Sequence, residues 1–332
     1  MKFTPECLGF SNIPEPENLR LATPGVNAVP HHPEWKRGVP RDSGAGWDFD
    51  DVRDYYLGSL YEVDPVRLRA EDPDRYMQLS RTVTGRVMER VFDEWRSAES
   101  ACGGGLVWFL KDLRAGAGWG IMDSQGNPKP VYHYLRRAWA PVRLAILDRG
   151  LDGVRIELHN ESARPLSGEL DVQIYGPESG VQAHAAQRVS VPERSSSTLA
   201  LEGILGHFAD PAYAYRFGAR RHVAIGARFQ SADLPSPLTG LYWPSLATPL
   251  AEVDLVCVVD PSTKTVSVKA PSLARDVRFE LRGAEALDNY FDVAPGSERT
   301  FSLAGIGGPD DPVRGFASAS NAPDGVRIST CD

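Results

Sequence analysis

The sequence has no surplus of basic residues. Its 332 residues include 36 Lys and Arg against 44 Asp and Glu, which gives a formal net charge of −8, and no run of five like charges occurs. Proteins that hold nucleic acid through its phosphates carry a basic stripe or patch. The charge pattern therefore argues against nucleic acid as a partner.

Long apolar runs are missing as well. No stretch approaches the roughly 20 apolar residues that a membrane helix requires. The first residues, Met-Lys-Phe-Thr-Pro-Glu, contain no apolar segment of the kind that a signal peptide needs. We therefore expect no membrane partner and a cytoplasmic location.

Cysteine is scarce. The four residues Cys7, Cys102, Cys257 and Cys331 show no CxxC spacing and no nearby pair of histidines. This pattern argues against a zinc site and against a disulfide framework. We expect four reduced thiols, no metal and no cofactor.

The sequence changes character near residue 141. Before that point, apolar residues recur with helical spacing over residues 76–101, between Asp72 and the glycines at 103–105. Residues 106–110 follow as a run that is apolar on both faces, which predicts a buried parallel strand. Residues 131–138 predict another helix, and this order of strand and helix indicates a β/α unit.

After residue 141 the apolar period becomes two. Val154, Ile156 and Leu158 alternate with polar residues, and similar runs recur as far as residue 303 between clusters of Gly, Pro, Asp and Ser. Short alternating strands of this kind are typical of antiparallel β-sandwiches, and about 190 residues suffice for two immunoglobulin-like domains. A break near residues 244–251 divides them. The predicted fold class is α/β plus all-β, with domains at 1–141, 142–248 and 249–332.

Residues 18–56 show no regular period. They are rich in Pro and Gly, yet they contain Trp35 and Trp47. Long irregular segments in compact domains are usually functional loops or disordered segments. The two tryptophans favour an ordered loop.

The N-terminal segment carries a more specific signal. In residues 3–14 (FTPECLGFSNIP), Glu6 lies eight positions before Pro14, with Phe10 and Ser11 between them. Taken alone, Glu6 is one carboxylate beside a proline, for which a surface position is the default. The segment resembles the nucleophile strand of glycoside hydrolase family 2, in its β-mannosidase-like branch, where a Glu ends barrel strand seven. The resemblance implies that Glu6 is the catalytic nucleophile.

The resemblance continues along the chain. Residues 105–112 (GLVWFLKD) resemble the eighth barrel strand, with Phe109 and Lys111 in place of the family's usual Gln and Asn. Residues 119–130 (WGIMDSQGNPKP) resemble the family's turn into the last barrel helix. The implied fold is the C-terminal part of a (β/α)8 TIM barrel, with strands seven and eight, followed by two immunoglobulin-like β-sandwich domains.

The resemblance also implies a sugar site that uses neither metal nor cofactor. Trp108 would stand near the sugar, because apolar ring faces suit the C–H faces of a pyranose; packing in the barrel core is the alternative. Trp35 and Trp47 would form the pocket rim, from the long loop after strand seven. Asp112 would hold sugar hydroxyls or cap its loop.

The chain resembles only the last part of such an enzyme. A complete (β/α)8 barrel takes about 250 residues, whereas about 140 precede the sandwiches here. The family's acid/base glutamate belongs to strand four, which we expect upstream of Met1. The implied function is retaining hydrolysis of terminal β-linked mannose, or a related hexose, from an oligosaccharide or glycoside, by a fragment that is inactive alone. The alternatives are a non-catalytic carbohydrate-binding or scaffolding remnant, or one half of a split enzyme.

A partial barrel would also leave strand edges without partners. The two strands expected at residues 3–10 and 106–110 would carry unpaired backbone groups, and such edges recruit other chains. We therefore expect residues 1–140 to associate, either with the N-terminal half of the enzyme or with a second copy of this chain.

Overall fold

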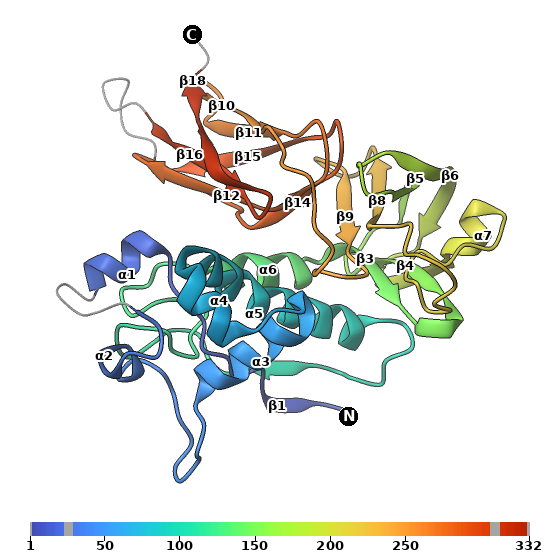
Figure 1. Cartoon of the computed structure of the whole chain (residues 1–332). Coiled ribbons are helices and arrows are strands. Elements are labelled where there is room, and N and C mark those ends of the chain that lie inside the picture. The colour runs from blue at the N-terminus through green and yellow to red at the C-terminus, as the bar shows by residue number, and fades with distance from the viewer. Residues whose placement is uncertain (1, 23–28, 306–312, 331–332) are drawn as a thin grey trace. The chain divides into compact units, whose positions relative to one another are not determined.

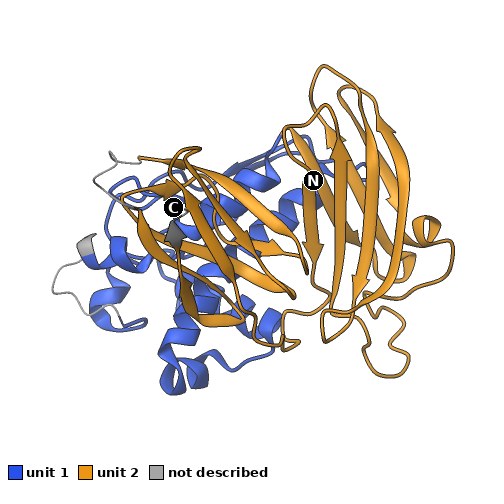
Figure 2. Ribbon diagram, turned by 90° about the horizontal axis from the view of Figure 1, so that it is seen from above, with its two compact units in different colours: residues 1–140 blue, residues 141–332 orange. Residues whose placement is uncertain are grey.

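Two compact units, residues 1–140 and 141–332, make up the chain in the computed structural model (Figure 2). The structure describes residues 2–22, 29–305 and 313–330. The first unit is mainly helical, and the second consists almost entirely of strands (Figure 1).

The first unit contains one small sheet and six helices among its described residues. In chain order its elements are β1 (Thr4–Cys7), α1 (Pro16–Ala22), α2 (Pro33–Lys36), α3 (Phe49–Tyr61), α4 (Pro65–Glu71), α5 (Pro73–Arg96), β2 (Gly105–Val107) and α6 (Pro130–Ala138).

The long helix predicted at residues 76–101 is confirmed as α5, with shifted ends. Pro73 occupies its first turn, where a missing N–H costs nothing, and the Asp72 carboxylate accepts from the Arg75 N–H as an N-cap. At the other end, the Ser97 hydroxyl donates to the Glu94 carbonyl, and Ser97 itself is extended. The apolar stripe is buried, with Val83 and Met88 fully inaccessible to solvent.

Helices α5 and α6 pack closely because α5 presents a glycine at their contact. A Cβ added to Gly85 would lie 2.2 Å from Cδ2 of Tyr134 on α6. Around this contact the core of the unit joins the helices to the segments that follow β1 and β2, and its buried members are Phe10, Met88, Phe92, Ile121, Val131, Leu135 and Ala138.

The prediction that residues 18–56 form an irregular loop is wrong for the described part of that segment. It contains most of α1, all of α2 and the first turns of α3. Local caps and burial stabilise these short helices: His32 Nδ1 accepts from the Glu34 N–H at the start of α2, and Asp48 and Asp51 form a capping box at the start of α3. Helices of one turn carry too few residues to show a period.

The sheet of the first unit pairs β1 with β2 in parallel, as the sequence predicts. Both strands are shorter than expected. The left-handed backbone of Leu8, with φ of 56°, ends β1 directly after Cys7.

The second unit begins with a β-sandwich built from two sheets. One sheet has the order β3-β4-β7 and the other the order β6-β5-β8-β9. Its elements are β3 (Val142–Asp148), a 3-10 turn η1 (Gly150–Asp152), β4 (Val154–Asn160), β5 (Leu166–Tyr175), β6 (Val181–Val191), β7 (Ser195–Ala200), α7 (Leu201–Leu205), β8 (Ala224–Ser231) and β9 (Leu238–Tyr242).

The alternating residues of β4 line the core of this sandwich, as predicted. Val154, Ile156 and Leu158 are buried against Val172 and Phe229 of the facing sheet. The polar residues between them do not all face solvent. Glu157 is fully buried, and its carboxylate accepts from the Thr198 hydroxyl at 3.3 Å.

A second pair of sheets follows from residue 253 onward. The five-stranded sheet has the order β13-β15-β11-β10-β18, and the four-stranded sheet has the order β14-β12-β16-β17. The strands are β10 (Val256–Asp260), β11 (Thr265–Lys269), β12 (Ala274–Arg282), β13 (Glu285–Ala286), β14 (Phe291–Val293), β15 (Glu298–Ala304), β16 (Arg314–Ala319), β17 (Ala322–Arg327) and β18 (Ser329–Thr330).

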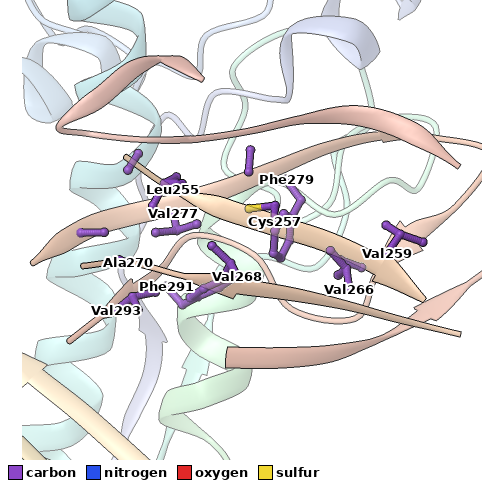
Figure 3. Packing of buried hydrophobic residues seen from close by; sticks show 14 of the residues in the cluster. Leu255, Cys257, Val259, Val266, Val268, Ala270, Val277, Phe279, Phe291 and Val293 are labelled. Atoms are coloured by element: carbon purple, nitrogen blue, oxygen red, sulfur yellow. The ribbon is translucent and has the colours of Figure 1, made fainter. Parts of the chain in front are cut away.

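The second pair of sheets has a core of its own. Figure 3 shows Cys257, Val266 and Val268 of the five-stranded sheet packed with Val277 and Phe279 of the four-stranded one. Within the second unit the chain thus forms two sandwiches with separate cores. The exact boundary at residues 248 and 249 stays a prediction.

The described thiols form no disulfide: Cys7, Cys102 and Cys257 are free, and Cys331 lies outside the described residues. Burial raises the pKa of Cys257 to about 12. In the described part of the chain, none of the helices combines the length and the apolar character that crossing a membrane requires.

Candidate active site

Glu6 lies on β1, on the open face of the two-stranded sheet. The register pairs Thr4 with Gly105 and Cys7 with Val107, so β1 carries one extra residue between these pairs. Such bulges re-aim side chains and are common beside active sites. Glu6 is exposed, whereas Val107 packs on the core of the unit.

Trp108 follows β2 at the same end of the sheet. Its backbone N–H donates to the Cys7 carbonyl at 3.1 Å, which fixes it beside the end of β1. The indole is 44% exposed, as is expected of a ring that is available to a ligand and not of a core residue.

An aromatic chain links Trp108 to Trp47. The Trp108 and Trp119 ring centroids are 6.3 Å apart, Trp119 and Phe49 are 5.0 Å apart, and Phe49 and Trp47 are 5.6 Å apart. All three contacts are edge-to-face, the arrangement that the ring quadrupoles favour. Trp47 is 46% exposed, so the chain of rings ends in an accessible indole on each side.

Asp112 is buried and does not face solvent. One of its oxygens accepts from the Gly120 N–H at 2.6 Å, and the other binds the ammonium of Lys129, whose side chain is wholly buried. Lys129 also donates to the carbonyls of Asn12, at 2.8 Å, and Gly118, at 3.2 Å. Burial lowers the pKa of Lys129, and the Asp112 carboxylate partly offsets this shift. Of the two predicted roles for Asp112, the geometry supports the loop cap.

Trp35 is also buried, with 4% of its surface exposed, and it does not line an open rim. Its indole N–H donates to Asp50 at 2.8 Å. Asp50 also accepts from Arg53 at 2.6 Å, and both of these side chains are fully buried. The Ser11 hydroxyl lies 2.8 Å from the Asp50 carboxylate and accepts from Arg53 at 3.0 Å. This network anchors the segment that follows β1.

The electrostatics of the network keep Asp50 charged. Burial by itself raises the pKa of Asp50, but the cations of Arg53 and Lys36 and the Ser11 hydroxyl outweigh burial and bring the pKa to about 2. The ion pair with Arg53 is therefore intact across the physiological pH range.

The predicted site residues thus fall into two groups. Glu6, Trp47 and Trp108 are exposed, whereas Trp35 and Asp112 belong to buried layers that fix the loops after β1 and β2. Sequence reasoning missed Phe49 and Arg53 as members of the region. Neither residue belongs to a recognisable motif. Their positions near Trp47 and near the start of a helix are the only features of the sequence that point to them.

The described residues contain no cluster of three or more His, Cys, Asp or Glu side chains arranged to hold a metal ion. The region offers the exposed carboxylate of Glu6 on β1 and the exposed indoles of Trp108 and Trp47. A carboxylate can act as a nucleophile or a proton acceptor, and the rings can hold an apolar sugar face.

The fold of the chain is found among solved structures. The chain aligns with a β-D-mannosidase from Dictyoglomus thermophilum with a TM-score of 0.75 and 16% identity, over 99% of this chain and 38% of that one. It also aligns with an exo-chitosanase from Amycolatopsis orientalis with a TM-score of 0.66 and 14% identity, over 96% of this chain and 41% of that one. The chain therefore shares the fold of about two fifths of each of these proteins.

The curated relatives that sequence comparison finds are β-mannosidases. Over 275 residues, the chain is 24% identical to β-mannosidase B of Aspergillus niger, covering 75% of this chain and 31% of that protein. For β-mannosidase B of Aspergillus flavus the identity is 25% over 283 residues, with 77% and 32% covered. No protein-family model matches the chain.

The resemblance expected from the sequence is confirmed: the chain is similar to the C-terminal portion of β-mannosidases of glycoside hydrolase family 2. It spans about a third of the length of the curated relatives that it matches.

Proposed function

We propose that the chain forms the C-terminal part of a β-mannosidase-like retaining glycosidase, in which Glu6 is the nucleophile. The observation that carries this proposal is the exposed carboxylate on β1 beside Trp108, in a chain similar to β-mannosidases. The substrate is an oligosaccharide or glycoside with a terminal β-linked mannose or related hexose. No metal or cofactor takes part.

In this proposal Glu6 attacks the anomeric carbon and forms a glycosyl-enzyme intermediate, which water then hydrolyses. A retaining glycosidase needs a second carboxyl group about 5–5.5 Å from the first, as acid and then as base. That group comes from barrel strands other than β1 and β2. Trp108 and Trp47 bind the sugar, while Asp112 and Trp35 hold the loops that carry these groups.

The fold assignment that fits this role makes β1 and β2 the seventh and eighth strands of a (β/α)8 barrel. The two sandwiches are then its immunoglobulin-like C-terminal domains. Among the described residues, β1 and β2 pair only with each other, and both Glu6 on β1 and Leu106 on β2 are exposed. A closed barrel leaves no strand edge unpaired. In the complete barrel the other six strands would therefore pair with the outer edges of β1 and β2 and surround their exposed side chains.

The test is a chimera in which this chain replaces the C-terminal third of the Aspergillus niger β-mannosidase B. We expect the chimera to hydrolyse an aryl β-mannoside, whereas this chain alone gives no turnover. Glu6→Gln should lower kcat of the chimera about a thousandfold or more, because the nucleophile is lost. Glu17→Gln is the matched control, since Glu17 is exposed and pairs with Arg20 on its own helix.

A fluorinated mannosyl fluoride that traps the intermediate should add one sugar to the peptide that contains Glu6. Full activity of the Glu6→Gln chimera would overturn the assignment of the nucleophile. A folded chimera that binds mannosides without turnover or labelling would instead support the alternative, a non-catalytic carbohydrate-binding remnant.

A further inference from the structure

A cavity of about 520 Å³ lies at one end of the first β-sandwich, away from Glu6 in the chain and within one unit. Its walls come from the end of β3, the turn η1 and the segment between α7 and β8. Asp148, Leu151, Tyr213, Arg216 and Arg220 are among its lining residues. The volume falls in the range of 300–1,000 Å³ that is usual for small-molecule sites.

The segment between α7 and β8 is fixed by its own hydrogen bonds. The Asp210 carboxylate accepts from the N–H groups of Ala214, at 2.7 Å, and Tyr215, at 2.9 Å. The Tyr213 hydroxyl donates to the Gly218 carbonyl at 2.6 Å. Tyr213 and Arg216 have left-handed backbones, with φ of 60° and 56°. Non-glycine residues adopt this conformation at a cost in free energy, and such strain gathers at functional sites.

The cavity wall carries two arginines, Arg216 and Arg220, and one aspartate, Asp148. Arg216 and Arg220 form no ion pair with the described residues, although the chain as a whole has a net charge of −8. The Arg220 guanidinium instead lies 5.1 Å from the centre of the Tyr213 ring, which holds it at the cavity wall. The acidic side chain among the lining residues is Asp148. Its carboxylate oxygens accept hydrogen bonds from the Tyr242 hydroxyl, at 2.8 Å, and from the Gly150 N–H, at 2.8 Å.

Two aromatic rings, those of Tyr215 and Phe208, adjoin the residues that line the cavity. The Tyr215 hydroxyl donates to the carbonyl of Leu151, a lining residue, and the Tyr215 ring packs edge-to-face on Phe208 at 5.5 Å. Phe208 is 64% exposed.

We propose that this cavity is a second carbohydrate site, separate from the catalytic one, and that it binds an acidic saccharide. A guanidinium presents N–H groups in a planar fork that matches a carboxylate. The tyrosine and phenylalanine rings offer apolar faces to the C–H groups of the sugar. A neutral sugar would leave the two arginines without a partner, and a simple anion would leave the rings uncovered. A uronic acid has a carboxylate for the arginines and C–H groups for the rings.

The test measures the affinity of the full-length chain for a tetrasaccharide of hexuronic acid and for the neutral tetrasaccharide of the same linkage. We expect the acidic sugar to bind at least tenfold more tightly than the neutral one, with an affinity that falls as salt is added. The double variant R216A/R220A should lose at least tenfold in affinity for the acidic sugar. The unfolding midpoint of each variant shows whether the chain is still folded.

The matched control is R188A/R228A, which removes the same charge from exposed arginines on β6 and β8 of the same sandwich. Its affinity for the acidic sugar should equal that of the wild type. Absence of binding, equal losses in both double variants, or equal affinity for the two tetrasaccharides would overturn the proposal. Because the readout is binding, the result does not depend on catalysis by Glu6.

Discussion

Removal of Arg53 should destabilise the first unit by about 3–5 kcal/mol. The Arg53 and Asp50 side chains are both fully buried and lie 2.6 Å apart, so water does not screen their interaction. In an Arg53→Met variant, Asp50 remains as a buried carboxylate without its closest cation, and breaking such a pair costs about that much. Arg53 also donates to the Tyr76 hydroxyl at 2.9 Å, and that bond is lost with it.

The assay is urea unfolding followed by tryptophan fluorescence. Six of the seven tryptophans precede residue 141, so the signal reports mainly on the first unit. Arg67→Met is the control: Arg67 pairs with Glu71 on the surface of α4, where both side chains are more than 60% exposed, and its loss should cost about 0.5 kcal/mol or less. A cost below about 1 kcal/mol for Arg53→Met would refute the argument that this pair anchors the segment after β1.

The same pair gives the first unit an acid transition. The pKa of Asp50 falls from 3.8 to about 2 on folding, since its cations and the Ser11 hydroxyl outweigh the effect of burial. The resulting stabilisation, about 2 kcal/mol, is complete above pH 4 and is lost as the pH falls towards 2. Asp50→Asn should flatten this part of the profile of unfolding free energy against pH. An unchanged profile would contradict the assignment.

Three further outcomes can be checked on the same protein. Gly85→Ala should destabilise the first unit by about 1–3 kcal/mol in urea unfolding, because its methyl group would overlap Tyr134, and a stabilised variant would contradict this. Residues 142–332 alone should give a cooperative calorimetric transition, since their cores contain only their own strands; a featureless trace would count against it. Light scattering at tens of micromolar should show association of the whole chain but not of residues 142–332. A monomeric whole chain would mean that β1 and β2 have no adhesive edges.

Helices and strands that are long enough to repeat the spacing of their apolar residues several times were predictable from the sequence. Helix α5 runs for 24 residues with a clear apolar stripe, and the alternation of Val154, Ile156 and Leu158 identified a core strand. The one-turn helix α2 was not predictable. Burial of Trp35 and the cap formed by His32 stabilise this helix, and neither feature produces a repeated spacing of apolar residues.

The candidate site was predictable only in part, and for a similar reason. The resemblance that singled out Glu6 and Trp108 lies in local segments of the sequence. Whether a tryptophan is exposed depends on partners that are distant in sequence, as the bond between Trp35 and Asp50 shows. The burial of Asp112 depends likewise on Lys129, which lies 17 residues away. No spacing rule anticipates either contact.

The pairing of β1 with β2 has a consequence for the order in which the chain folds. The Cys7 thiol and the Leu106 carbonyl that it contacts are 99 positions apart in the sequence, and the Lys129 ammonium reaches back 117 positions to Asn12. At a synthesis rate of roughly 5–20 residues per second, the partners of β1 leave the ribosome about 5–20 s after it does.

During that interval α3, α4 and α5 can already pack, because their contacts are local, whereas closing a long loop costs entropy before it gains any contact. The strand that carries Glu6 is therefore fixed late in the folding of the first unit. Until then it is an extended segment free to pair with the wrong chain. During synthesis this strand, more than the sandwiches, is therefore where a chaperone would protect the nascent chain.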